Sequence, residues 1–301
     1  MFFKKYKNEC AICKKTFFTF MMTKKDSLYL CNNCTNLCKK NNPYCYNALQ
    51  IYSIEDLKSS IVLNKSVASI KHEKKVELYK KERKEQYLRT LSSINFIVPT
   101  ETEKVKRKYL KDFPYFNYSQ IRKNIPQHKL DNFVVIDTET TGLRPSMDEL
   151  LEISAIKFIN AIPVECLTTL VKPKKEISST TININHITDE MVSTSPKVEN
   201  IIKDFSDFIK GYNIVGYNLE FDLKFLHCNG MDFFSEKRQF YDVLQLCRKC
   251  IDKYNVPNYK LDTICDYCDL PRTQQHRATE DALVTGILFR DFGYQIKNGE
   301  I

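Results

Sequence analysis

The chain has 301 residues, of which 43% are apolar, so it can hold one large domain and a small one. No apolar run is long enough to cross a bilayer, and residues 1–5 lack the apolar region of a signal peptide, which predicts an intracellular, cytoplasmic protein with no membrane partner. Twelve cysteines in that compartment indicate metal binding rather than disulfides.

Charge divides the chain into two unequal parts. Residues 1–130 carry 27 Lys and Arg against 11 Asp and Glu, and the remainder carries 19 against 26, so the net charges are +16 and −7. This pattern is typical of a polyanion-binding arm joined to a domain that collects cations. Solvated lysine-rich helices would give the same totals, and composition does not choose between the two.

The first element is a pair of Cys-x2-Cys motifs, Cys10/Cys13 and Cys31/Cys34. Zinc binds four soft ligands in a tetrahedron, and each motif lets one tight turn supply two thiolates. A piece this short buries little core, so a structural metal gives it a reason to fold. Residues 1–60 are therefore predicted to form a module with one structural Zn²⁺, for which Cys38 is an alternative ligand.

Within this module, residues 16–20 and 27–30 are predicted to be strands joined by a turn at residues 23–26, and Ser53 to cap a helix with Asp56. The cysteine spacing resembles that of small treble-clef and zinc-ribbon modules. Such modules bind nucleic acid in some proteins and partner proteins in others.

Residues 61–131 are predicted to be a charged helix, at residues 67–94, followed by a linker that prolines interrupt. Its arginines and lysines alternate with Tyr115, Phe116 and Tyr118. Such residues can hold single strands by phosphate contact and base stacking, or simply pack the linker onto its domain.

The third predicted domain, residues 132–295, opens with an apolar strand that ends in Asp137 and Glu139. Side chains two apart on a strand point to the same face, and paired buried acids are costly without a cation between them. A divalent-metal site is one interpretation, and a core strand running into an acidic loop is the other.

Further along, strands are predicted at residues 150–159, 164–171 and 240–243, and helices at 197–210, 243–252 and 261–269. Residues 214–226 are predicted to be a short strand that turns into a helix, and a last helix is predicted from just after His276 to about residue 292. Strands alternating with helices indicate an α/β domain. Asp222 lies in the first turns of a helix, where it either caps that helix or supplies a third carboxylate.

A second cysteine group, Cys247, Cys250, Cys265 and Cys268, has zinc-like spacing. Each pair falls on the expected apolar face of a predicted helix, so these residues are interpreted as small buried apolar side chains rather than a second zinc site.

His276 and Asp281 complete the set near the end of the chain. Four acids without cysteine suit Mg²⁺ or Mn²⁺, and two such ions can hold the attacking and leaving oxygens of a phosphoryl displacement. A neutral imidazole beside them can take a proton from water. These acids and this histidine are the groups that a metal-dependent phosphodiesterase uses.

Three motifs now stand in order: Asp137-Thr-Glu139-Thr-Thr-Gly-Leu143, Val215-Gly-Tyr-Asn218-Leu-Glu-Phe-Asp222 and His276-Arg-Ala-Thr-Glu-Asp281. Together they resemble the DnaQ-like exonucleases, the histidine branch of the DEDD superfamily, which includes proofreading subunits of bacterial DNA polymerase III. The resemblance implies a ribonuclease-H-like mixed sheet flanked by helices. It also implies 3′→5′ removal of nucleotides, two metals on the four acids, and His276 as general base. By the same analogy Thr140, Thr141, Leu143 and Asn218 contact the substrate. Tyr217 stands where many members have histidine.

The leading hypothesis is thus a metal-dependent 3′→5′ exonuclease acting on single-stranded ends, with DNA as the preferred substrate and a polymerase as a partner in trans. An exoribonuclease of the same fold is one alternative. A protein that binds nucleic acid or a partner through the zinc module is the other.

Overall fold

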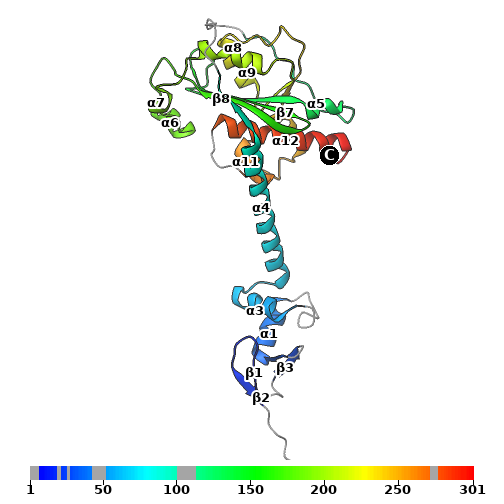
Figure 1. Ribbon diagram of the computed structural model, residues 1–301. Coiled ribbons are helices and arrows are strands. Elements are labelled where there is room, and N and C mark those ends of the chain that lie inside the picture. The colour runs from blue at the N-terminus through cyan, green and yellow to red at the C-terminus, as the bar shows by residue number, and fades with distance from the viewer. Residues whose placement is uncertain (1–6, 19–21, 26–27, 43–51, 100–112, 272–276) are drawn as a thin grey trace, which may run out of the picture. The chain divides into compact units, whose positions relative to one another are not determined.

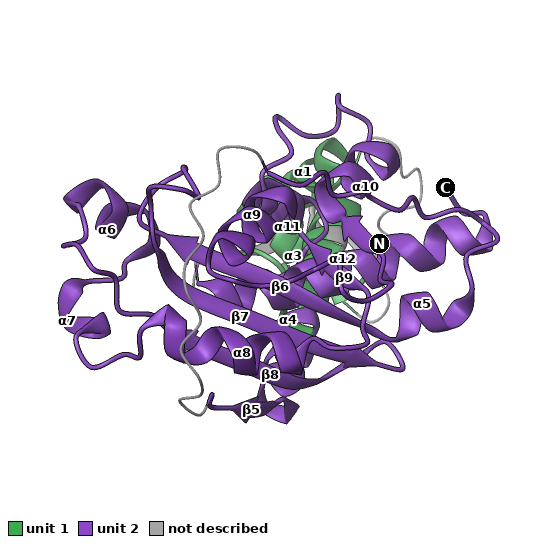
Figure 2. Ribbon diagram, turned by 90° about the horizontal axis from the view of Figure 1, so that it is seen from above, with its two compact units in different colours: residues 1–82 green, residues 83–301 purple. Residues whose placement is uncertain are grey.

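The computed structural model describes residues 7–18, 22–25, 28–42, 52–99, 113–271 and 277–301. The chain forms two compact units, residues 1–82 and 83–301, coloured separately in Figure 2. The domain boundaries drawn from the sequence, after residues 60 and 131, stay predictions.

Unit 1 begins with two short antiparallel hairpins. They pair β1 (Lys7–Glu9) with β2 (Thr16–Phe18) and β3 (Met22–Lys25) with β4 (Leu28–Cys31). The turn between β1 and β2 contains Cys10 and Cys13 and is closed by Lys14, whose φ is 61° and whose N–H donates to the Cys10 carbonyl at 3.0 Å. The predicted turn at residues 23–26 is wrong, because residues 22–25 form β3, which pairs with β4.

The described helices that follow are α1 (Asn32–Asn41), α3 (Ile54–Leu63) and α4 (Val67–Ser93). The predicted cap of α3 is confirmed, since the Asp56 N–H donates to Ser53 Oγ at 3.1 Å. Buried Asn42 connects α1 with the start of α4 by accepting from the Val67 N–H at 2.8 Å. Unit 1 thus has a small apolar core supported by capping side chains.

Unit 2 is built on a six-stranded sheet in the order β10-β9-β6-β7-β8-β5. The strands are β5 (Asn95–Ile97), β6 (Phe133–Thr140), β7 (Leu150–Ile159), β8 (Ile162–Leu170), β9 (Ile214–Gly216) and β10 (Phe240–Asp242). Strands β6, β7 and β8 are antiparallel neighbours, whereas β9 runs parallel to β6 and to β10, and β5 runs parallel to β8. The predicted mixed sheet flanked by helices is confirmed.

The helices of unit 2 are α5 (Gln127–Asp131), α6 (Ser179–Asn185), α7 (Asp189–Val192), α8 (Val198–Phe208), α9 (Glu220–Cys228), α10 (Val243–Cys250), α11 (Leu261–Tyr267) and α12 (Ala278–Asn298). In Figure 1, α8 and α9 cover the upper face of the sheet, and α11 and α12 cover the lower face. The sheet is therefore the middle of three layers.

Alternation along β6 divides its side chains between these two faces. Val135 packs in the cluster that contains the apolar residues of α12, whereas Val134 and Ile136 pack in the cluster that contains those of α8 and α9. By the same alternation, Asp137 and Glu139 face α12, and Thr138 faces α9. Both helices can therefore deliver side chains to the end of one strand.

Close approach of α12 to the sheet depends on Gly286. A Cβ at this position would lie 2.3 Å from Phe158 Cζ and 2.9 Å from Val135 Cγ2. The Phe158 ring is itself held, because it stacks on Phe133 at a centroid distance of 4.7 Å. Any larger residue at 286 would lift α12 away from β6 and β7.

The stretch from 95 to 131 was predicted to lack regular elements, and this is wrong at both ends. Residues 95–97 form β5, which pairs in parallel with β8, and residues 127–131 form α5. Pro126 precedes the first turn of α5 and does not interrupt it, because a missing N–H costs nothing there.

No helix in the part of the chain that the structure describes is both long enough and apolar enough to span a membrane.

Candidate active site

The acids of the first and third motifs converge at the end of β6. Asp137, Glu139 and Asp281 each offer a carboxylate oxygen, and these three oxygens lie within 4.8 Å of one another. Two of the acids come from β6, and the third comes from the first turns of α12 on the sheet face that they share. Oxygens at this separation can share a hard divalent cation.

Asp222 reaches the same strand from the other face. It is 3% exposed on α9, and its Oδ1 accepts a 2.7 Å hydrogen bond from Thr138 Oγ1. This hydroxyl orients the carboxylate at the end of β6. Thr138, between the two acids of the first motif, was not singled out from the sequence.

Electrostatics at the cluster favour a bound cation. Burial, and then repulsion from Asp222, Asp281 and Glu139, hold the pKa of Asp137 well above its ordinary value. Burial and neighbouring acids raise the pKa of Glu139 to about 8, and burial raises that of Asp222 to about 7 although the Thr138 bond lowers it. Protons or cations must therefore neutralise the cluster at neutral pH.

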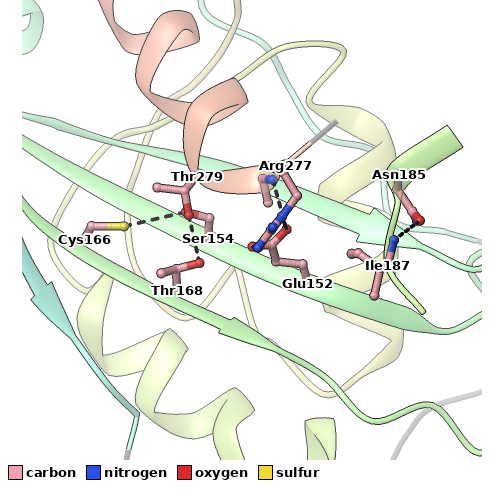
Figure 3. A network of polar contacts seen from close by, with 9 residues as sticks. Glu152, Ser154, Cys166, Thr168, Asn185, Ile187, Arg277 and Thr279 are labelled. Carbon is pink, nitrogen blue, oxygen red and sulfur yellow. Dashed lines mark hydrogen bonds and ion pairs between the residues drawn. The ribbon is translucent and has the colours of Figure 1, made fainter. Parts of the chain in front are cut away.

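Another acid, Glu152, is buried and lies directly opposite Glu139 in the β6–β7 register. Arg277 donates to both of its oxygens, from Nε to Oε2 and from Nη2 to Oε1, each at 3.1 Å. The Ala278 N–H adds a bond to Oε2 at 3.2 Å. Figure 3 shows this ion pair beside the start of α12. The signal in the sequence was an acid inside an apolar strand, but its partner lies 125 residues away.

The predicted substrate residues lie around this edge of the sheet. Thr141 is fixed by bonds from the Glu149 N–H to its hydroxyl at 2.9 Å and from Thr181 Oγ1 to its carbonyl at 3.0 Å. Thr140 Oγ1 donates to the Gly142 carbonyl at 2.7 Å. The Leu143 side chain is 81% exposed, so it is available to a ligand.

Asn218 opens the second motif with a left-handed backbone, at φ 56°. Its N–H donates to Asp242 Oδ1 at 3.0 Å, which ties the β9–α9 turn to the end of β10. The side chain of Tyr217, which replaces the common histidine, donates from its hydroxyl to the Tyr259 carbonyl at 2.6 Å. This tyrosine supports the turn beside the site through a neighbouring loop.

His276, the predicted general base, lies outside the described residues, and its neighbour Arg277 is the first described residue after it. The described part of the third motif is Arg277 to Asp281, and it reaches the site as predicted from its order along the chain. The roles of His276, Asp281 and the other predicted site residues stay predictions.

The zinc-ligand candidates fall in unit 1. Sulfurs of Cys10, Cys13 and Cys34 lie within 4.8 Å of one another, whereas the side chain of Cys31 is outside the described residues. Cys38 is fully buried, and burial and then Cys10 raise the pKa of its thiol to about 11, which disfavours it as a thiolate ligand.

The second cysteine group behaves differently. Among the described residues, the groups of three or more metal-binding side chains within 4.8 Å are the acid cluster and the unit 1 cysteines, so this second group is not one of them. Cys247 is buried and packs in the apolar core of unit 2. Burial and the neighbouring cysteines raise the pKa of its thiol, in keeping with the apolar interpretation.

Comparison with known proteins identifies relatives of unit 2. The model of the RNase_T family, described as exonuclease, matches residues 134–289, just over half of the chain. The DNA polymerase III PolC-type of Oceanobacillus iheyensis is 34% identical over 173 residues, which are 57% of this chain and 12% of that protein. The PolC-type polymerase of Thermotoga maritima is 35% identical over 170 residues, 55% of this chain and 12% of that protein. The chain spans about one eighth of the length of these relatives.

Solved structures of similar shape include Exonuclease X in complex with 5′ overhanging duplex DNA, at 24% identity and a TM-score of 0.43, covering 54% of this chain and 92% of that one. Escherichia coli Exonuclease I in complex with a dT13 oligonucleotide has 17% identity and a TM-score of 0.49, covering 56% of this chain and 42% of that one.

Proposed function

Since the chain belongs to the RNase_T exonuclease family, we propose that its residues 132–295 remove nucleotides from the 3′ ends of single-stranded DNA. The family match confirms the resemblance drawn from the three motifs. The observation that carries the proposal is the meeting of Asp137, Glu139 and Asp281 oxygens within 4.8 Å. DNA is preferred as substrate because the relatives are DNA polymerases by name.

The donor set suits hard cations. Asp137, Glu139, Asp222 and Asp281 offer only carboxylate oxygens, which Mg²⁺ and Mn²⁺ prefer, and burial and the neighbouring acids raise the pKa of Glu139. Two bound ions would polarise the scissile phosphate and lower the pKa of an attacking water. In this proposal Thr138 orients Asp222, and His276 accepts the proton of the water.

Substrate contacts follow from exposure and from the backbone around β6. Leu143 extends into solvent from the loop that Thr141 and Thr181 fix in place, so we infer that it packs against the terminal base. Two further contacts to the terminal nucleotide are proposed. One is the backbone of Thr140 and Thr141 in the first motif, and the other is the side chain of Asn218 in the second motif.

For unit 1 we propose one structural zinc held by Cys10, Cys13, Cys31 and Cys34. Two sulfurs on a tetrahedral zinc lie about 3.8 Å apart, because each Zn–S bond is about 2.3 Å long. The grouping of three cysteine sulfurs within 4.8 Å supports this arrangement. The excess of basic residues before residue 130 favours nucleic acid as the ligand of this half, and the PolC-type relatives favour a polymerase as partner in trans.

The experiment uses DNA and RNA oligonucleotides of one sequence, labelled at either end, with Mg²⁺ or Mn²⁺. A 3′→5′ exonuclease releases a labelled mononucleotide first from the 3′-labelled strand and produces a ladder from the 5′-labelled one. Asp137→Asn and Asp281→Asn should abolish release, and Asp262→Asn, in the first turn of α11, should not. No release by the wild type, or undiminished release by both site variants, would overturn the proposal. Faster release from RNA would identify the exoribonuclease instead.

A further inference from the structure

The ion pair of Glu152 and Arg277 is more than a local contact, because both partners adjoin the acid cluster. Glu152 is 3% exposed on β7 and faces Glu139 across the β6–β7 ladder. A buried carboxylate among other carboxylates is costly without a partner. Here three N–H groups bind it, two from the Arg277 guanidinium and one from the Ala278 backbone.

These three bonds give Glu152 a role different from that of the metal-ligand candidates. Among the described residues, the acids whose oxygens lie within 4.8 Å of one another are Asp137, Glu139 and Asp281. Glu152 is adjacent to them but directs its oxygens to the start of α12. Its chemistry is therefore that of an anchor for N–H donors rather than of a further metal ligand.

The anchored segment carries Asp281. The Asp281 N–H donates to the Arg277 carbonyl at 3.1 Å, so one helical turn separates the bonded guanidinium residue from the metal-ligand candidate. Thr279 adds a second attachment in this turn, because its Oγ1 donates to Thr168 Oγ1 on β8 at 2.9 Å (Figure 3). The first turn of α12 is thus fastened to β7 and to β8.

We propose that Glu152 is a positioning residue: through Arg277 and Ala278 it holds the first turn of α12 against β7 and so places Asp281 beside Asp137 and Glu139. The proposal rests on the proposed function of this cluster.

Electrostatics agree with this role. Arg277 lowers the pKa of Glu139, whereas burial, Asp281, Glu152 and Asp222 raise it. Removing the guanidinium therefore leaves two buried acids, Glu152 and Glu139, without their nearest compensating charge. Loss of either partner should weaken cation binding by misplacing Asp281, not by removing a ligand.

The test compares the wild type with Glu152→Gln, which keeps the side-chain volume but places an amide against Arg277. Two quantities are measured: Mn²⁺ binding without nucleic acid, by electron paramagnetic resonance, and the kcat, the KM for the oligonucleotide and the half-saturating Mg²⁺ concentration of nucleotide release. We expect Mn²⁺ affinity and kcat to fall by about tenfold to one-hundredfold, as for other residues that orient metal ligands, with little change in KM.

The control is the ion pair Lys157–Glu165, in which Lys157 lies on β7, like Glu152, and Glu165 lies on β8 at 2.9 Å. Glu165→Gln should leave Mn²⁺ binding and kcat unchanged. Arg277→Lys, which keeps the charge but not the two-pronged geometry, should resemble Glu152→Gln, and it serves as the second variant if Glu152→Gln fails to fold.

Wild-type Mn²⁺ affinity and kcat in folded Glu152→Gln or Arg277→Lys would overturn the positioning role. An inactive wild type would instead contradict the proposed function, and Mn²⁺ binding by the variants would still decide the role of Glu152.

Discussion

Thr138 Oγ1 donates a 2.7 Å hydrogen bond to Asp222 Oδ1, and both residues are buried. The bond joins β6 to α9 at the point where β6 also presents Asp137 and Glu139 to α12. One strand thus gathers the acids of both helices, with its odd positions directed to one face and its even position, Thr138, to the other. This relationship gives the first prediction.

Thr138→Val keeps the shape of the side chain and removes the hydroxyl. Asp222 then loses the hydroxyl that donates to its Oδ1, so we expect a loss of about 1–3 kcal/mol in stability. The half-saturating Mg²⁺ concentration should rise, because the Asp222 carboxylate is no longer oriented. Urea unfolding and Mg²⁺ titration of nucleotide release measure the two effects. Thr263→Val, which removes an exposed hydroxyl bonded to Asn258, is the control. Equal stability and Mg²⁺ response in both variants would contradict the role of Thr138.

The acid cluster should make the folding stability of the metal-free protein fall as the pH rises. Burial raises the pKa of Glu139 from 4.5 to about 8, so between these values the folded chain holds a proton that the unfolded chain has released. Folding stability should therefore fall as the pH rises from about 5 to 8. Thermal unfolding in a metal-free buffer across this range measures the slope.

Glu139→Gln should flatten that slope, whereas Glu176→Gln at an exposed position should leave it unchanged. Adding Mg²⁺ should restore stability at pH 8, where the acids are free to bind it. A metal-free wild type that gains stability between pH 5 and 8 would contradict the assignment.

Gly286 allows α12 to approach the sheet. Gly286→Ala would bring a Cβ to 2.3 Å from Phe158 Cζ, so we expect a loss of about 1–3 kcal/mol from overpacking, together with reduced activity as Asp281 moves with its helix. Gly293→Ala on the same helix is the control, because its Cβ would meet the flexible end of Leu130. Chemical denaturation of the two variants makes the comparison. If Gly293→Ala lost more unfolding free energy than Gly286→Ala, the Phe158 ring would be easier to displace than the Leu130 side chain, contrary to its stacking on Phe133.

Unit 1 should depend on zinc independently of the nuclease site. Cys10→Ser with Cys13→Ser should abolish one equivalent of bound zinc and make residues 1–60 sensitive to limited proteolysis, since a small metal module loses its folding energy with the ion. The rate of nucleotide release from a short oligonucleotide should stay the same. Elemental analysis of the wild type should find one zinc per chain, and about two would instead assign a site to the Cys247 group.

Much of the fold followed from periodicity. The bounds predicted for β7 agree with the structure because most of its residues are apolar, as in a strand that is buried on both faces. β5 was missed because its three residues are too short for periodicity and are recruited by a strand far along the chain. Residues 23–25 were mistaken for part of a turn because they are polar, whereas they pair with β4. Local sequence patterns were therefore sufficient to find most strands and helices, but not to predict which strands pair with one another.

The site divides in the same way. The order of the acids along the chain was sufficient to group Asp137, Glu139 and Asp281, and the structure brings their oxygens together. Thr138 and Glu152 were not found, since each acts through a partner remote in the chain, Asp222 and Arg277. Residues that bind a metal recur in recognisable spacing, whereas residues that orient them are identified only by contact.

If metal ions held by this cluster act on the terminal phosphodiester, the rate must depend on how well they bind its non-bridging oxygens. The measurement uses an oligonucleotide whose last linkage carries sulfur in place of one such oxygen. Because Mg²⁺ prefers oxygen and Mn²⁺ tolerates sulfur better, we expect sulfur to slow release of the last nucleotide about tenfold or more in Mg²⁺ and Mn²⁺ largely to restore the rate. Equal rates for the sulfur and oxygen substrates in Mg²⁺, or release that persists in a chelator, would contradict it.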